Sequence, residues 1–599
     1  MRLSPLAFAL LSVSCTTLAA SPTKPFADRI YVGGDIITVN DSDLTAEALA
    51  IKNGRILAVG KESELMKLRD DKTKIFDLDE KTMIPGFIDG HGHVFNTGIQ
   101  ALSANLLADP DGNVNSIASL QEELRSWVAK PENGKHGIIL GFGYDDSQLK
   151  EQRHPTRQEL DEVSKDLPVL IIHQSGHLAT LNTKALELAG LTSESTDPDG
   201  GKIRRESDGK TPNGVLEETA FFGTLLPLFA KLNAKENEVI FKAGMELYAS
   251  FGYTTAQEGR ASTSAVKTMY NLAQEEKLPI DVAAYPDIQV AQEVISPPYY
   301  SSEYSNGFRV AGAKLNLDGS PQGKTAWLTE PYLVPPVGQE KGYKGYPSMS
   351  DKKAAEYIEL AHRNGWQLLT HVNGDAAIDQ LLNGIETSEK IHGIPDRGFI
   401  AIHAQTARKD QVESFKRLGV FPSFFPMHTF YWGDWHMNSV LGKERAENIS
   451  PTGWARDLGM IYTSHHDSPV ALPNSMRVYS ATVNRVSRTG HVLGPQQRVS
   501  ALDGLKSQTL WAATQYKEEK NKGSLEVGKL ADLVILSDNP LTAKPATLSD
   551  IRVLETIKEG QTIYSSDQQV ALGSCINTKR CQEIATTAMI SAGLLHHSH

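Results

Sequence analysis

The chain has 599 residues, of which 40% are hydrophobic and 22% are charged, and its formal net charge is −12. This is the composition of a soluble globular protein and not of a disordered or fibrous chain. The negative charge, without a cluster of Lys and Arg, argues against a protein that binds nucleic acid or an anionic membrane surface.

The first 20 residues have the pattern of a secretory signal peptide. Arg2 precedes an apolar stretch from Leu3 to Val13, and small residues follow. The apolar stretch is too short to span a membrane, which takes about 20 residues. We therefore expect cleavage after Ala19 or Ala20, and a periplasmic or secreted protein with no transmembrane segment in its mature form. Lipidation at Cys15 is the alternative.

The two ends of the remaining chain share a β-rich texture. Residues 21–84 consist of short apolar runs separated by turns, and Asn53-Gly54 between two of these runs is a strong hairpin signal. Residues 501–566 repeat the texture. We expect the two segments to form one small β-sandwich domain that brings the chain ends together.

Helices and strands alternate in the middle of the chain, over residues 85–500. A predicted helix over 351–365 precedes a strand at 366–372, for example, and the helix over 376–391 precedes a strand at 399–404. Such alternation predicts parallel strands joined by crossover helices. At this length it favours a (β/α)8 TIM-type barrel with insertions, mainly within residues 95–250. A doubly wound open sheet is the alternative.

A short tail, residues 567–599, carries Cys575 and Cys581. An exported protein meets oxidising conditions, so we expect a local disulfide between this pair. The histidines of the terminal "LLHHSH" are interpreted as adventitious metal binders in a frayed end.

The first polar residues at a predicted strand end are His91 and His93, which follow the apolar run "TMIPGFID". The active site of a (β/α)8 barrel lies at the carboxyl ends of its strands. Two residues apart on an extended segment, the two histidines point to the same side. On their own they are either turn residues or half of a metal site, and imidazole suits zinc.

Lys314 lies inside the alternating strand "RVAGAKLNLDGS". A lysine in the middle of a barrel strand has to be paired or chemically altered. It either pairs with Asp318 or another buried acid, or reacts with CO2 to give a carbamate, an anionic ligand that bridges two metal ions.

Three further polar residues follow apolar strands: His371, His403 and Asp467. Two strand-end histidines on successive strands, after a His-x-His strand, favour a shared metal site. Asp467 is either a ligand that also accepts a proton, or a turn residue. Of its neighbours His465 and His466, at most one is expected to reach the site. Asp375 is expected to cap the helix that follows His371.

These segments resemble, in order, the metal signature of the amidohydrolase superfamily: "PGFIDGHGH", the strand-embedded Lys314, "LLTHVNGDAAID", "AIHAQ" and "HHDSPV". Three others, "HQSGHLATLNTKAL", "GVLEE" and "AKLNLDGS", resemble the narrower amidohydrolase 3 group, which includes N-substituted formamide deformylase-like proteins. The resemblance implies a barrel flanked by a β-sandwich and one or two divalent metal ions, usually Zn2+.

By position, the resemblance assigns a role to each residue. It implies that His91 and His93 bind one ion, that His371 and His403 bind the second, and that a carboxylated Lys314 bridges the two. It also implies that Asp467 is both ligand and general base. His177 in "SGHLATLN" lies outside the metal set, and we expect it to contact substrate rather than only to pack.

The predicted function is hydrolysis of a non-peptide C–N bond in a small-molecule amide, such as an N-formyl or N-acyl amide, by attack of metal-bound hydroxide. The alternatives are a cyclic amide or ester hydrolase or a ring deaminase on the same site, and a catalytically silent exported metal-binding protein. The sequence has neither a G-x-S-x-G elbow nor a G-x-G-x-x-G after a strand. The aromatic residues of 424–437 either line one wall of the substrate site, for an apolar or aromatic group, or simply pack within a long loop.

Overall fold

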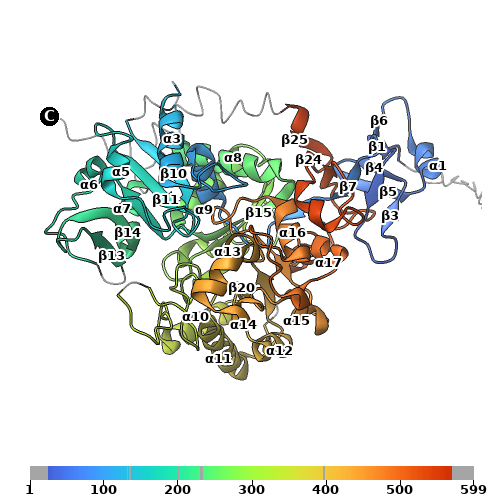
Figure 1. The fold of residues 1–599 in the computed structure, drawn as a ribbon. Helices are drawn as coiled ribbons and strands as arrows, with labels where there is room; N and C mark the ends of the chain where they lie inside the picture. The colour runs from blue at the N-terminus through green and yellow to red at the C-terminus, as the bar shows by residue number, and fades with distance from the viewer. Residues whose placement is uncertain are drawn as a thin grey trace, which may run out of the picture.

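The computed structural model describes residues 25–568, apart from 131–132, 134–136, 199–200, 230–233, 337 and 396–397. Within these residues the chain forms five sheets with helices between them, a mixed α/β fold (Figure 1). No helix of the described part is long and apolar enough to cross a membrane. The predicted signal peptide with Cys15, and the predicted Cys575–Cys581 disulfide, lie outside the described residues.

Two parallel sheets occupy the middle of the chain. The first has the order β17-β16-β15-β8 and the second β18-β19-β20-β21-β22. The strands are β8 (Phe87–Ile88), β15 (Tyr253–Ala261), β16 (Asp281–Pro286), β17 (Phe308–Val310), β18 (Gly312–Asn316), β19 (Gln367–Val372), β20 (Phe399–His403), β21 (Phe421–Phe424) and β22 (Thr463–Ser464). Every pairing within both sheets is parallel, as the alternation of helices and strands predicts.

The crossover helices follow from local signals in the sequence. They include α9 (Thr263–Glu275), α10 (Asp351–Arg363), α11 (Asp375–His392) and α12 (Lys409–Arg417). Before α10 the Ser350 side chain accepts a hydrogen bond from the backbone N–H of Lys353, and Gly365 follows the helix with a φ of 65°. The strands between these helices are buried runs such as "QLLTHV" and "FIAIH", as expected where helices cover a parallel sheet.

The ends of the described chain meet in a six-stranded sheet of order β25-β24-β23-β7-β2-β3. In it β7 (Thr82–Pro85) pairs with β23 (Leu533–Leu536), and blue and red ribbon lie side by side in Figure 1. The other strands are β2 (Asp35–Ile37), β3 (Thr45–Ala46), β24 (Val553–Lys558) and β25 (Gln561–Ser565). The segment 501–566 does not open with strands: α17 (Ala501–Lys506) and α18 (Leu510–Gln515) come first, and Ser500 caps α17.

A four-stranded sheet of order β5-β4-β1-β6 shares a hydrophobic cluster with that sheet. Its strands are β1 (Arg29–Val32), β4 (Ala48–Lys52), β5 (Arg55–Gly60) and β6 (Lys74–Asp77). The predicted hairpin joins β4 and β5, and its turn residues Asn53 and Gly54 have φ values of 49° and 74°. The β-sandwich and the predicted domain boundaries stay predictions.

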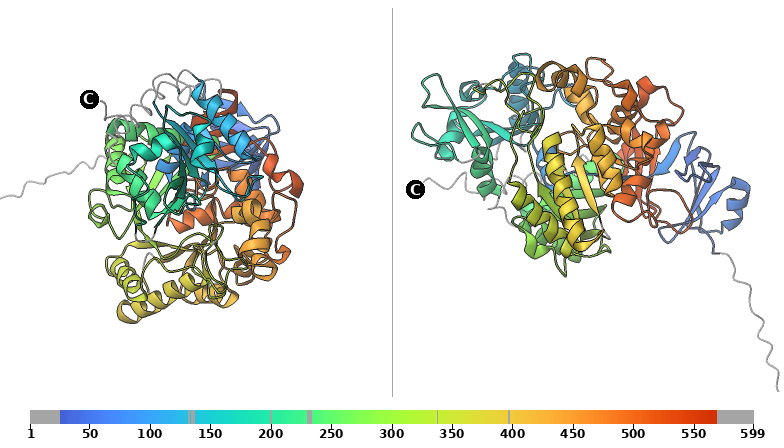
Figure 2. Two further views of the ribbon diagram at one scale, coloured as in Figure 1. Left: turned by 60° about the vertical axis from the view of Figure 1, so that its left-hand side comes forward. Right: turned by 90° about the horizontal axis from the view of Figure 1, so that it is seen from below.

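A further sheet, of order β13-β14-β12-β11-β10-β9, lies within the region where insertions were expected. Its strands are β9 (Ala104–Asn105), β10 (Ile139–Tyr144), β11 (Val169–His173), β12 (Leu178–Leu181), β13 (Gly201–Arg205) and β14 (Pro212–Glu218). Figure 2 shows this part, in teal, at one end of the molecule beside the green and yellow parallel strands. We call it the inserted sheet.

The helix α13 (Met427–Trp435) replaces the long loop expected over residues 424–437, and a π-helical turn continues it over His436–Val440. Polar and apolar residues are spread around all sides of this helix, so its sequence shows no helical period. Its Met427, Tyr431 and Trp432 pack in one hydrophobic cluster with Phe425, so packing accounts for much of this aromatic segment.

Candidate metal centre

The six predicted metal-site residues all lie in or directly after parallel strands. His91 and His93 follow β8, Lys314 lies in β18, His371 in β19, His403 ends β20, and Asp467 follows β22. Neighbouring parallel strands end at the same edge of a sheet, which brings these side chains together. Five of the six are buried, and His93 is partly buried.

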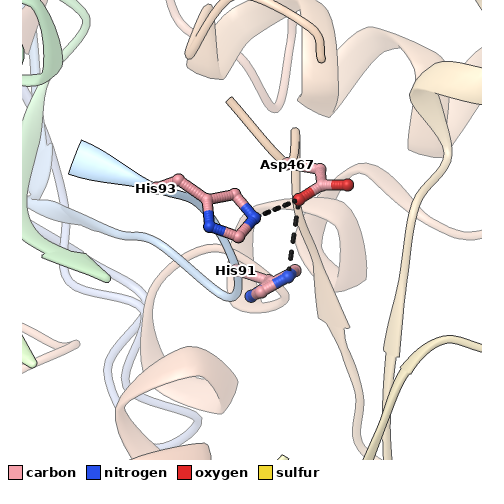
Figure 3. A group of neighbouring side chains, drawn as sticks. All are labelled: His91, His93 and Asp467. Carbon is pink, nitrogen blue, oxygen red and sulfur yellow. Dashed lines mark hydrogen bonds and ion pairs between the residues drawn. The ribbon is translucent and has the colours of Figure 1, made fainter. Parts of the chain in front are cut away.

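His91, His93 and Asp467 form one compact group (Figure 3). Oδ1 of Asp467 lies 3.2 Å from Nε2 of His93 and 3.4 Å from Nε2 of His91. Behind the rings, Nδ1 of His91 lies 2.5 Å from Oε1 of Gln257, and Nδ1 of His93 lies 2.7 Å from the carbonyl oxygen of Gly259. Both of these oxygens accept an Nδ1–H, so each Nε2 is left with a lone pair that faces Asp467.

His371 and His403 form the second group. Nδ1 of His371 lies 3.1 Å from Nε2 of His403, and Oδ2 of Asp467 lies 3.8 Å from the same Nε2. Nε2 of His371 lies 3.2 Å from the carbonyl oxygen of Gly319, which accepts its proton and leaves the Nδ1 lone pair toward His403. Among the described residues, Nδ1 of His403 has no hydrogen-bond partner. Asp467 thus touches both groups.

Lys314 lies beside the first group, with Nζ 2.9 Å from Nε2 of His91. Burial lowers the pKa of its amine to about 7, although the negative charge of Asp467 acts in the opposite direction. The pairing of Lys314 with Asp318 is wrong, because Asp318 accepts the backbone N–H groups of residues 327, 373 and 374 instead. Lys314 forms no ion pair with any described acid within 4.0 Å.

The set of donors fits a divalent metal ion. It combines neutral imidazoles with one carboxylate, which are the ligands that zinc prefers. Burial lowers the pKa of His91, His371 and His403 well below the ordinary range, so these rings are uncharged and have lone pairs to donate. Several lone pairs and an anion facing one another in a buried space call for a cation between them.

Backbone strain gathers at the same place. His403 and Asp467 have φ values of 70° and 53°, in the left-handed region that non-glycine residues rarely adopt. Each such residue costs about 1–3 kcal/mol and persists where the surrounding structure holds it, often at functional sites. Here the strain turns two predicted ligands toward the shared space.

Sequence reasoning missed the residues behind the ligands. Asp89 is buried, accepts the backbone N–H of His91 at 2.9 Å, and has its pKa raised by burial to about 7. Gly92 is required there, since a Cβ would lie 2.1 Å from Oη of Tyr248 and 2.7 Å from a carboxylate oxygen of Asp89. Asp89 comes directly after the apolar residues of β8, so its place at a strand end could have marked it as a site residue. No local sequence pattern indicated Gln257.

The two histidines before Asp467, His465 and His466, point to different places. His465 borders the site, with its ring centroid 5.4 Å from that of His91 and 5.1 Å from that of His403. His466 instead turns toward Asp89, 3.3 Å away.

The expected helix cap at Asp375 is wrong: Gly374 is the N-cap residue of α11, and Asp375 accepts hydrogen bonds from Thr329 across the loop.

His177 stands in the inserted sheet, directly before β12, where its Nδ1 lies 2.9 Å from Oε2 of Glu218 at the end of β14. Burial disfavours the charged ring, but Glu218 outweighs this effect and raises the pKa of His177, with Asp467 acting in the same direction. The His177 side chain is 21% exposed. The charge of Asp467, a predicted metal ligand, therefore acts on the His177 ring.

A second group of His and Asp lies in the inserted sheet, formed by Asp145, Asp146 and His173. Nε2 of His173 lies 3.1 Å from Oδ1 of Asp146 and 3.7 Å from Oδ1 of Asp145. Burial disfavours its charge, but the two carboxylates raise the pKa of His173 to about 9. This group is an ion-paired network in which Asp146 is partly exposed, and Trp432 of α13 donates a hydrogen bond to Asp145.

Comparison with known proteins gives one consistent result. Residues 74–564 match the Amidohydrolase family. The chain is 29% identical to the protein LONG AFTER FAR-RED 3 of Arabidopsis thaliana, over 91% of this chain and 92% of that protein. It is 25% identical to the N-substituted formamide deformylase of Arthrobacter pascens, over 90% of this chain and 98% of that enzyme.

A solved structure agrees with these matches. An uncharacterized metal-dependent hydrolase from Pyrococcus horikoshii OT3 superposes with a TM-score of 0.69 and 26% sequence identity. The match covers 86% of this chain and 99% of that one. The family match confirms the resemblance found in the sequence, and the solved structure shares the fold over nearly its whole length.

Proposed function

Because the chain belongs to the amidohydrolase family, we propose that it is a metal-dependent hydrolase that cleaves a non-peptide C–N bond, such as that of an N-formyl or N-acyl amide. The observation that carries the proposal is the convergence of the lone pairs of His91 and His93 on Asp467. The relative from Arthrobacter pascens, an N-substituted formamide deformylase by name, supports an amide as the substrate.

The proposed centre uses the residues of both groups. His91, His93 and Asp467 would hold one divalent ion, and His371 and His403 a second. Nitrogen and carboxylate ligands of this kind favour zinc. Ions bound there would lower the pKa of a water molecule and polarise the scissile carbonyl.

We further propose that Lys314 is carboxylated in the mature enzyme. Its pKa of about 7 leaves much of the amine neutral at physiological pH, and the neutral amine is the form that reacts with CO2. The carbamate would carry its negative charge into the space beside His91, between the two groups of ligands.

The protein's own residues would handle the protons. Asp467 accepts the proton of the attacking water and returns it to the departing nitrogen, as a general base and then a general acid. The contacts of its carboxylate with histidines of both groups support this role. The His177 ring, held at its Nδ1 by Glu218, would donate a hydrogen bond to the substrate from its Nε2.

The barrel belongs to the same proposal. The two parallel sheets would be halves of one (β/α)8 barrel, joined on one side by the parallel bridge between Asp287 and Lys314. On the other side, Gln515 donates to the carbonyl of Gly90 after β8 and accepts from the hydroxyl of Thr463 in β22. We also propose a sandwich of the two terminal sheets and export to the periplasm or medium, on the sequence pattern of the first 20 residues.

Metal analysis and a substrate panel test the proposal together. The mature protein should contain one or two equivalents of zinc and should hydrolyse members of a panel of N-formyl and N-acyl amides. Chelation should abolish this activity and added zinc should restore it. Tightly bound metal without turnover of any amide, lactam or ester would instead favour the silent metal-binding protein.

A further inference from the structure

One charged side chain at the edge of the candidate centre has no role in the proposed chemistry. Arg260 is the single exposed residue of the otherwise buried strand β15. It sits at a β-bulge, where the register with β16 shifts between Gly259 and Ala261, and its φ is 53°. Bulges next to active sites redirect a side chain, and here the bulge turns an arginine out of the sheet.

Asp287, which follows β16, anchors one side of the Arg260 guanidinium. Nε of Arg260 donates to Oδ2 of Asp287 at 2.9 Å, and the carboxylate is largely buried, with 9% of its side chain exposed. The two terminal Nη groups donate to no described residue, and the arginine side chain remains 44% exposed. An arginine held at Nε presents the rest of its planar fork to a ligand.

The backbone ties this arginine to the candidate centre. The carbonyl of Gly259, the residue before it, accepts the Nδ1–H of His93. Its anchor Asp287 forms a parallel bridge with Lys314. Arg260 therefore stands at the rim formed by the ends of β15 and β16, beside Lys314 of β18.

A second polar group, the His177 ring of the inserted sheet, feels the charge of Arg260. The positive charge of Arg260 lowers the pKa of His177, and the negative charge of Asp467 raises it, so both residues lie within electrostatic reach of His177. His177, directly before β12, and Arg260, on β15, thus come from two different parts of the fold. A substrate that bridges this rim meets donors and positive charge.

We propose that the Nη groups of Arg260 bind a carboxylate of the substrate, so that the hydrolysed compound is an N-acyl or N-formyl amino acid or a similar carboxylate-bearing amide. This inference rests on the proposed function. The guanidinium fork matches a carboxylate in a bidentate manner, which gives both affinity and orientation. The separation between the Arg260 guanidinium and the metal-site residues is fixed by the fold. It would therefore favour substrates in which the carboxylate and the scissile amide are the same distance apart.

Matched substrate pairs test the inference. A panel of N-formyl and N-acetyl amino acids is compared with the corresponding carboxamides, which keep the shape and lose the charge. The wild type should prefer the carboxylates, and Arg260→Gln should lower kcat/KM for them about 10- to 150-fold, mainly through KM. For the carboxamides, kcat/KM of the same variant should stay within about threefold of the wild-type value. Arg260→Lys should restore part of the loss, because it keeps the charge but not the fork.

Two controls separate this inference from the proposed function. Arg417→Gln removes an exposed arginine on α12 that pairs with Glu386, and it should change neither substrate class. Binding of N-formylphenylalanine and its carboxamide to Asp467→Asn, with and without Arg260→Gln, is measured by calorimetry and does not depend on turnover.

Hydrolysis without any preference for carboxylates, or equal losses for both classes in Arg260→Gln, would overturn the inference and leave the proposed function standing. If no amide is hydrolysed, the proposed function fails, and the calorimetry still decides the inference. Carboxylate binding that Arg260→Gln weakens supports the subsite, and binding that it leaves unchanged, or no binding at all, overturns it.

Discussion

Gln257 holds the imidazole of His91: its Oε1 lies 2.5 Å from Nδ1 of the ring, and both residues are buried. The Gln257 amide is itself held, because its Nε2 donates to the hydroxyl of Tyr516 at 2.7 Å. This chain of contacts sets both the orientation of the His91 ring and the nitrogen that bears its proton. Gln257 on β15 thus orients His91, a predicted metal ligand on the loop after β8.

Replacing Gln257 should therefore weaken metal binding without touching a ligand. We expect Gln257→Leu to lower the zinc affinity about 10- to 100-fold, because the His91 ring loses the acceptor for its Nδ1–H. Competition with a chromophoric chelator measures the affinity. Gln257→Glu, which keeps an acceptor oxygen, should recover much of it. Wild-type affinity in Gln257→Leu would contradict the role assigned to this glutamine.

Asp467 should separate metal binding from catalysis. We expect Asp467→Asn to lower kcat about 10²- to 10⁴-fold, because an amide cannot take up and return the proton. The carboxamide oxygen can still face the histidine nitrogens, so most of the bound metal should remain. Metal content and steady-state kinetics on the same preparation give both readouts, and turnover close to wild type would exclude Asp467 as general base.

The glycine between the first two histidines should tolerate no side chain. A Cβ at residue 92 would lie 2.1 Å from Oη of Tyr248, and that tyrosine is fully buried on α8 (Ala234–Ser250). We expect Gly92→Ala to lower the free energy of unfolding by about 1–3 kcal/mol and to lower metal content. Urea titration and metal analysis measure the two effects.

Gly223 provides the matched control for this substitution. It lies in α7 (Thr219–Phe229), and a Cβ there would meet nothing within 4 Å. Gly223→Ala should therefore leave metal content unchanged and raise the free energy of unfolding by about 0.4–1 kcal/mol. Equal destabilisation in both variants would show that crowding by Tyr248 is not the cause.

The ion-paired network in the inserted sheet should make stability depend on pH. The pKa of His173 is raised to about 9 in the folded protein, against about 6.5 in an unfolded chain. A raised pKa contributes stability that is complete below the unfolded value and is lost as the pH rises through the folded value. The contribution of His173 should therefore decline between about pH 6.5 and 9.

Urea unfolding of the wild type and His173→Gln across this range measures the effect. The difference in free energy of unfolding between the two proteins should be largest near the low end and shrink toward the high end. Parallel pH curves would mean that His173 stays neutral, in which case its group with Asp145 and Asp146 becomes a candidate for binding a metal ion.

Much of the candidate centre could be predicted because its residues sit at strand ends. The apolar runs before His91, His371, His403 and Asp467 are local patterns, and their parallel pairing follows from the alternation with helices. The burial of Lys314 was also predictable, from its place in an alternating strand. Periodicity failed over residues 427–435, where His428, Thr429 and Asp434 are scattered among the apolar residues and form no single polar face to mark the helical period.

The sequence by itself determined the family, the parallel α/β core and the set of strand-end side chains, because these depend on short apolar runs and on the residue that follows each run. Only the tertiary structure decided which side chains hydrogen-bond to these strand-end residues and surround them. Gln257 lies 166 residues from His91, and Glu218 lies 41 residues from His177. Such contacts arise from the packing of strands distant in the chain, and no local pattern records which side chain a neighbouring strand will bring.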